Sequence, residues 1–183
     1  MKKYLSILLF ITFFAGFLAL QVALDLSDTS ARLTPVDKKI KLYYEDLFKS
    51  SSFLTLNGKR IRLKELEAPI VILNFWATWC IPCIEEFPSL VALSKRFNNK
   101  QVFIVGVNTD NTDIRRVISK AIKRHKLNFP IVSDSNGHIS KEYMVSSLPF
   151  ALIYKQGEVL DIWNGKKDYS DPELIEQFIA AQK

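Results

Sequence analysis

The sequence predicts an α/β domain with a mixed central sheet flanked by helices. Two apolar runs rich in β-branched residues, Pro69–Ala77 and Gln101–Asn108, suit strands that are buried on both faces. A helical pattern follows each run, and this order is typical of a parallel unit with a right-handed crossover. Two later runs joined at Lys155–Gly157 predict an antiparallel pair, which makes the sheet mixed.

A hairpin is expected where the domain begins. Apolar residues alternate through Phe53–Leu63 around Asn57-Gly58, and an Asn-Gly pair accepts the positive φ of a tight turn. The helix after the first buried strand is expected from about Cys80 to Phe97.

The remaining elements follow in chain order. Apolar residues at helical spacing predict a helix within Thr112–Leu127. A short strand, an Asn136-Gly137 turn and a short helix follow it. The last helix is expected to be capped by Ser170 or Asp171. Its inner face would consist of Leu174, Ile175, Phe178 and Ile179.

The N-terminus predicts a membrane anchor. Lys2 and Lys3 precede Leu5–Leu24, which has no charged residue and would form a helix of about 30 Å, the thickness of the hydrocarbon layer. A cleaved signal peptide is the alternative, but neither Ala19 nor Ala23 has a small residue two positions before it. In either case the lysines stay in the cytoplasm and the rest is exported. We therefore expect a single-pass protein of the bacterial inner membrane with its domain on the periplasmic, extracytoplasmic side.

The predicted organisation is a transmembrane helix at 1–24, a polar linker at 25–52 and a folded domain at 53–183. A short helix around Leu42–Phe48 is possible within the linker. The formal net charge of +6 is a mild bias and does not indicate a nucleic-acid partner. Basic residues form the outer face of the helix at 112–127; this face is either only solvated or contacts an anionic membrane surface or acidic partner. They are Arg115, Arg116, Lys120, Lys123, Arg124 and Lys126.

The segment WATWCIPC contains both cysteines of the chain, Cys80 and Cys83. A structural zinc site needs about four ligands, and the two histidines, His125 and His138, lie far along the chain, so metal binding is disfavoured. A purely structural disulfide is also disfavoured, because closing so small a loop removes little unfolded-state entropy. Redox exchange is the favoured chemistry, since a strand precedes the pair and a helix follows it.

The spacing explains how such a pair would work. Cys80 begins the helix, where unpaired N–H groups and the helix dipole stabilise a thiolate. Pro82 is tolerated in the first turn because no partner is needed for an N–H there. Cys83 lies one turn further and can attack a mixed disulfide formed at Cys80. Cys80 is therefore the predicted exposed nucleophile, and Cys83 the resolving thiol.

The stretch NFWATWCIPCIEEFP resembles thioredoxin-like proteins, in particular the TlpA/ResA branch of membrane-anchored or exported thiol-disulfide oxidoreductases. The resemblance covers about Phe53 to the C-terminus and implies a thioredoxin-like fold. It also implies that SSLPFALIY is the family's cis-proline loop, with a cis bond before Pro149. The backbone of Leu148 would then pair with a bound peptide. The alternative is a trans proline that opens an edge strand.

Three more residues matter, the first two through the same resemblance and the third because it stands beside the cysteine pair. Asn74 stands where cytoplasmic thioredoxins have a buried aspartate. Glu86 stands where the branch often has a glutamate near the cysteines. If buried, it would have a raised pKa and could relay a proton to or from Cys83; otherwise it is a solvated helix residue. Trp79 is a candidate for an exposed contact with the partner, although a packing role is also open.

The resulting hypothesis is an extracytoplasmic thiol-disulfide oxidoreductase that reduces protein disulfides. It would need no cofactor beyond its own disulfide, but it would need a membrane electron donor. A disulfide-forming oxidase is the first alternative, and a redox-inert binding or metallochaperone module is the second. A thiol peroxidase is disfavoured because Thr78 lies only two residues before Cys80, not three. The substrate stays open, and the Ile81-Pro82 dipeptide leaves the redox potential open as well.

Overall fold

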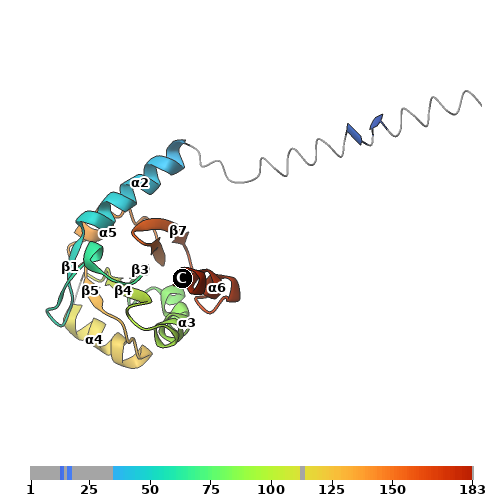
Figure 1. Ribbon diagram of the computed structural model, residues 1–183. Helices are drawn as coiled ribbons and strands as arrows, with labels where there is room; N and C mark the ends of the chain where they lie inside the picture. Colours follow the sequence, from blue (N-terminus) through green and yellow to red (C-terminus); the bar gives the residue numbers. More distant parts are fainter. Residues whose placement is uncertain (1–12, 15, 18–34, 112–113, 183) are drawn as a thin grey trace, which may run out of the picture. The chain divides into compact units, whose positions relative to one another are not determined.

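The computed structural model describes residues 13, 14, 16, 17, 35–111 and 114–182 (Figure 1). The chain divides into two compact units, Met1–Ile40 and Lys41–Lys183. The expected anchor Leu5–Leu24 lies outside the described residues, apart from four helical positions at 13, 14, 16 and 17. Within the described ranges, no helix has both the length and the apolar content needed to cross a bilayer.

The second unit is built on a five-stranded mixed sheet with the order β5-β4-β3-β6-β7. β3 (Ile70–Trp76) is central and lies parallel to β4 (Val102–Asn108) and antiparallel to β6 (Phe150–Lys155). β5 (Ile131–Ser133) and β7 (Glu158–Asn164) form the two edges. The predicted mixed sheet is therefore confirmed, including the parallel β3–β4 pair and the antiparallel β6–β7 pair.

Side chains of β3 alternate between two hydrophobic cores because successive residues of a strand point to opposite faces. Ile70, Ile72 and Trp76 belong to one core, which also contains residues of α3 (Ile81–Arg96) and α6 (Pro172–Ala180). The helix α4 (Ile114–His125) contributes Ile118 to this same core. Val71, Leu73 and Phe75 belong to the other core, against which Ile139 of the short α5 (His138–Glu142) packs. The predicted helices on both faces are thus confirmed.

The predicted hairpin is also present. β1 (Ser52–Leu54) pairs antiparallel with β2 (Arg60–Arg62), and a short 3₁₀ turn, η1 (Leu63–Glu65), follows. Gly58 has φ +82°, the left-handed conformation for which Asn-Gly was expected. In α6, Asp171 is the N-cap, and its side chain accepts hydrogen bonds from two backbone N–H groups.

One face prediction in α6 is wrong. Ile179 is 42% exposed, whereas the other three expected inner residues are buried. The core contact of this short helix is a narrow stripe, and Ile179 lies beside it.

The segment before the hairpin differs most from its prediction. The helix α2 (Pro35–Ser50) is longer than the short helix considered at 42–48, and from Lys41 on it belongs to the second unit. Tyr44, Leu47 and Phe48 are buried there, and the Tyr44 hydroxyl donates to the carbonyl of Tyr143 (3.1 Å). The folded unit therefore begins at Lys41 and not near Phe53, because the end of the expected linker covers one face of the sheet.

Phe48→Ala should test this part of the core. The Phe48 ring is 8% exposed and lies 4.8 Å from the ring of Tyr154, so its removal should lower the free energy of unfolding by about 3–5 kcal/mol. Leu42→Ala is the matched control on the same helix; Leu42 is 52% exposed, and its loss should change the free energy by less than about 1 kcal/mol. Urea unfolding at pH 7 measures both, and equal midpoints for the two variants would contradict the packing.

Candidate functional site

The cysteine pair lies where the chain passes from β3 into α3. Cys80 and Cys83 form a disulfide with an S–S distance of 2.06 Å and a Cα–Cα distance of 5.3 Å. Cys80 is the N-cap of α3, and its sulfur accepts a hydrogen bond from the backbone N–H of Cys83 (3.3 Å). Pro82 lies in the first turn, as expected. A thiolate at Cys80 would therefore meet an N–H donor and the positive end of the helix dipole.

Cys80 is less accessible in the disulfide form than the sequence suggested. It is 4% exposed and Cys83 is fully buried, so Cys80 is the more accessible of the two but is not an open side chain. Its neighbours Trp79 and Ile81 are 70% and 69% exposed. The surface around the disulfide is thus apolar, and Trp79 occupies the exposed position expected of a partner contact. The alternative of a packing role for Trp79 does not agree with this exposure.

The loop before β6 contains the expected cis bond between Leu148 and Pro149. Pro149 is buried, and its carbonyl accepts a hydrogen bond from the N–H of Gly165 (2.8 Å). Leu148 is half-buried and packs against both cores. The cis-proline loop implied by the family resemblance is therefore present in the fold.

Glu86 is buried in a polar cluster one turn beyond Cys83. It is 1% exposed, and its Oε1 accepts a hydrogen bond from the Asn74 amide nitrogen (2.5 Å). Its Oε2 accepts from the backbone N–H of Lys167 (3.3 Å). The same Asn74 nitrogen donates to the hydroxyl of Tyr169 (3.3 Å), which is also buried. Of the two alternatives for Glu86, the structure supports the buried one.

Burial sets the protonation of this cluster. It raises the pKa of Glu86 from 4.5 to about 7, although the hydrogen bonds from Asn74 and Lys167 and the charge of Lys166 act in the opposite direction. Burial, with the nearby Glu86, also raises the pKa of Tyr169. Glu86 can therefore exchange a proton near neutral pH. Its neighbour Glu85 is half-exposed and forms a salt bridge with Lys166 (2.7 Å).

A second buried carboxylate, which the sequence did not single out, holds the loop before the cysteines. Asp110 accepts from the backbone N–H of Thr78 (3.1 Å) and from its hydroxyl (3.2 Å). It also accepts from the Asn108 amide (2.8 Å) at the end of β4. The end of β4 thus fixes the loop that leads to Cys80. Adjacent parallel strands end at the same sheet edge, and this was the one sequence signal for the contact.

The two histidines lie on different helices. His125 lies on α4 with its ring centroid 5.4 Å from that of Phe87, and Phe87 packs edge-on against Trp76 (5.1 Å). Burial and the neighbouring Arg124 lower the pKa of His125. His138 is exposed in its turn. Among the described residues, no group of three or more His, Cys, Asp or Glu side chains is placed to hold a metal ion.

The sheet, the disulfide at a helix N-terminus and the cis proline define a thiol-disulfide oxidoreductase with a thioredoxin-like fold. The chain belongs to the AhpC/TSA family, whose model matches residues 45–161. Thiol-disulfide oxidoreductase ResA of Bacillus thuringiensis is 37% identical to it over 125 residues, which make up 68% of this chain and 69% of that relative. ResA of Bacillus subtilis is 40% identical over 110 residues, 60% of each chain.

Solved structures agree with this assignment. StoA from Bacillus subtilis matches with a TM-score of 0.58 and 28% identity, covering 70% of this chain and 95% of StoA. A secreted Mycobacterium tuberculosis disulfide oxidoreductase homologous to E. coli DsbE matches with a TM-score of 0.61 and 25% identity, covering 74% and 98%. The predictions of the family, the thioredoxin-like domain and the enzyme class are therefore confirmed.

Proposed function

We propose that this enzyme reduces disulfides of proteins outside the bacterial inner membrane, to which Leu5–Leu24 tethers it. The observation that supports the direction of transfer is the buried Glu86, one turn from Cys83. A carboxylate with a pKa of about 7 is partly charged at neutral pH and works against a nearby thiolate. The helix N-terminus favours the thiolate of Cys80, but no histidine lies between the cysteines to add to this effect. A less favoured reduced form corresponds to a more reducing couple.

The reaction needs no group beyond the two cysteines. The Cys80 thiolate attacks one sulfur of the substrate disulfide, forms a mixed disulfide and releases the other substrate sulfur as a thiolate. The Cys83 thiol loses its proton, for which the buried Glu86, one turn further along the same helix, is the proposed acceptor, and then attacks the sulfur of Cys80. This step releases the second substrate thiolate and leaves the Cys80–Cys83 disulfide. Two electrons have then passed from the enzyme to the substrate.

The substrate would be a cysteine-containing protein. It would cover the apolar surface of Trp79 and Ile81 and pair with the backbone at Leu148, beside cis-Pro149, as an added strand. Because the compartment outside the membrane is oxidising, the spent disulfide must be reduced again. We assign this task to an electron donor in the membrane, next to the tether.

The redox potential tests the direction of transfer. Equilibrated with glutathione buffers, the protein should have a potential near or below about −200 mV, and it should reduce insulin when it is supplied with dithiothreitol. The Cys80→Ser variant is the control for insulin reduction. A potential near about −120 mV, the value of a strong oxidant, would instead support the alternative of a disulfide-forming oxidase.

Membrane retention tests the tether. A carbonate wash removes peripheral proteins but not a transmembrane helix, so washed membranes should keep the full-length chain, with Lys41–Lys183 open to protease from outside. Recovery of a soluble form that begins near residue 24 would show a cleaved signal peptide.

A further inference from the structure

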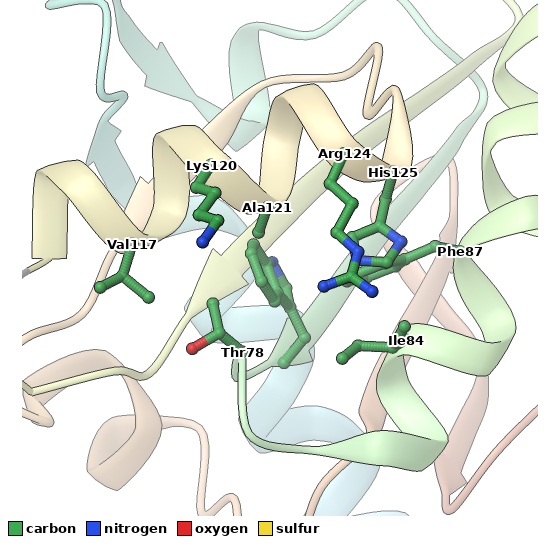
Figure 2. Close-up of a pocket in the computed structure, with 9 residues that line it drawn as sticks. Thr78, Ile84, Phe87, Val117, Lys120, Ala121, Arg124 and His125 are labelled. Atoms are coloured by element: carbon green, nitrogen blue, oxygen red, sulfur yellow. The ribbon is translucent and has the colours of Figure 1, made fainter.

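A pocket of about 180 Å³ lies between α3 and α4, directly beside the loop that leads to the cysteines (Figure 2). Its apolar wall is made by Ile84 and Phe87 of α3 and by Val117 and Ala121 of α4, together with the indole of Trp76. Ile84 follows Cys83 directly in the chain. The pocket lining thus includes residues that stand one and two positions from the cysteines in the chain.

Basic side chains complete the pocket. Figure 2 shows Lys120 and Arg124 reaching from α4 toward Thr78 and Ile84, with His125 beside them. Both Lys120 and Arg124 are exposed, and within the described part of the chain neither forms a salt bridge.

The buried carboxylate that holds Thr78 forms no salt bridge with either cation in the described part of the chain. Asp110 is 5% exposed, and its oxygens already accept hydrogen bonds from Thr78 and Asn108. Lys120 and Arg124 are four residues apart on one helix, so their like charges also repel each other. The pocket therefore joins an apolar wall to two exposed cations that form no salt bridge with the described residues.

This combination fits a short acidic side chain. The methylene groups of a glutamate or aspartate suit the apolar wall, and its carboxylate suits the guanidinium of Arg124 and the ammonium of Lys120. The space is too small for a large ligand, and its place beside Thr78 is within reach of a polypeptide whose sulfur is attached to Cys80. We propose that this pocket binds an acidic residue near the reacting cysteine of the protein substrate and so selects among substrates. The inference rests on the proposed reduction of protein disulfides.

Paired peptides can test the pocket. The probes are acetylated peptides closed by one disulfide and identical except for a Glu or a Gln at successive positions on either side of the attacked cysteine. The reduced full chain is mixed with each peptide, and the rate of peptide reduction is followed by chromatography. For at least one position of the varied residue, the wild type should reduce the Glu peptide about threefold to tenfold faster than the matching Gln peptide. The expected factor is modest because exposed charge pairs contribute little free energy. The preference should fall at high salt.

Variants of α4 assign the preference to the pocket. Lys120→Gln together with Arg124→Gln should bring the Glu-to-Gln rate ratio close to one. The matched control is Arg115→Gln together with Lys123→Gln, which removes the same charge from the same helix outside the pocket lining. This control should keep the preference.

Four results would overturn the proposal. A preference that survives in the Lys120 and Arg124 variant would show that the pocket does not bind the acid. An equal loss in the control pair would assign the effect to the overall charge of α4. A wild-type protein that reduces both peptides at equal rates would overturn the pocket alone, whereas one that reduces neither would overturn the proposed function and the pocket with it.

Discussion

Cys83→Ser should stop turnover and leave the substrate covalently attached to Cys80. The serine hydroxyl cannot attack the mixed disulfide under these conditions, so the reaction halts after its first step. The variant should therefore release one substrate sulfur per enzyme and no more. Cys80→Ser should form no such adduct, because Cys83 is fully buried and its sulfur is not accessible to a protein substrate.

Non-reducing gels and mass spectrometry measure both outcomes. Insulin reduction should be undetectable above the uncatalysed rate in either variant, and a substrate adduct should be found only with Cys83→Ser. Both variants lack the disulfide, so circular dichroism at the assay temperature serves as the control that they are folded. Adduct formation through Cys83 in the Cys80→Ser variant would reverse the assigned roles.

The elements that were predicted well have signals within a few neighbouring residues. β3 is buried at all seven of its positions, and a run of β-branched and aromatic residues in the sequence is enough to indicate this. The position of Cys80 at the start of a helix that follows a strand has the same kind of local signal. The cis bond at Pro149 was reached through the family resemblance, since an X–Pro sequence alone does not select the cis form.

The features that were missed depend on contacts between distant parts of the chain. The end of α2 looks polar, and only its packing against Tyr143 and Tyr154 shows that Tyr44 and Phe48 are core residues. Tyr169 lies 95 residues from Asn74, and nothing in the local sequence joins it to the Glu86 cluster. Folding brings these distant residues together, so the contact can be identified only from the structure.

Glu86 should make the stability of the oxidised protein fall as pH rises. Its pKa is about 7 in the folded state against 4.5 as the ordinary value, so the folded protein binds the proton more tightly than the unfolded chain does. The contribution of Glu86 to stability is therefore complete below pH 4.5 and is lost as pH rises through 7, by about 3 kcal/mol in total. Asn74 can form a hydrogen bond with either protonation state of Glu86. Its nitrogen donates to the charged carboxylate, and after rotation of the amide its unpartnered Oδ1 can accept the proton of the neutral acid.

Glu86→Gln should remove this dependence. Urea unfolding gives the free energy of unfolding of both proteins at pH 4.5 and pH 8. The value for the variant minus the value for the wild type should be about 3 kcal/mol larger at pH 8 than at pH 4.5. Glu85→Gln is the control, because Glu85 is half-exposed on the same helix and should leave the pH dependence unchanged. Parallel stability curves for wild type and Glu86→Gln would contradict a raised pKa in the folded protein.

The same variant separates a catalytic use of that proton from a purely structural one. If Glu86 accepts the proton of Cys83, Glu86→Gln should slow the resolving step at pH 7 and lower the pKa of the Cys83 thiol, because the opposing negative charge is gone. Stopped-flow measurement of mixed-disulfide resolution across pH 5–9 would show the parent rate rising near pH 7 and the variant rate losing that rise. If the variant loses the pH dependence of its stability but keeps the rate profile of the parent, the role of Glu86 is structural only. A change in both profiles would place the buried carboxylate in the exchange reaction itself.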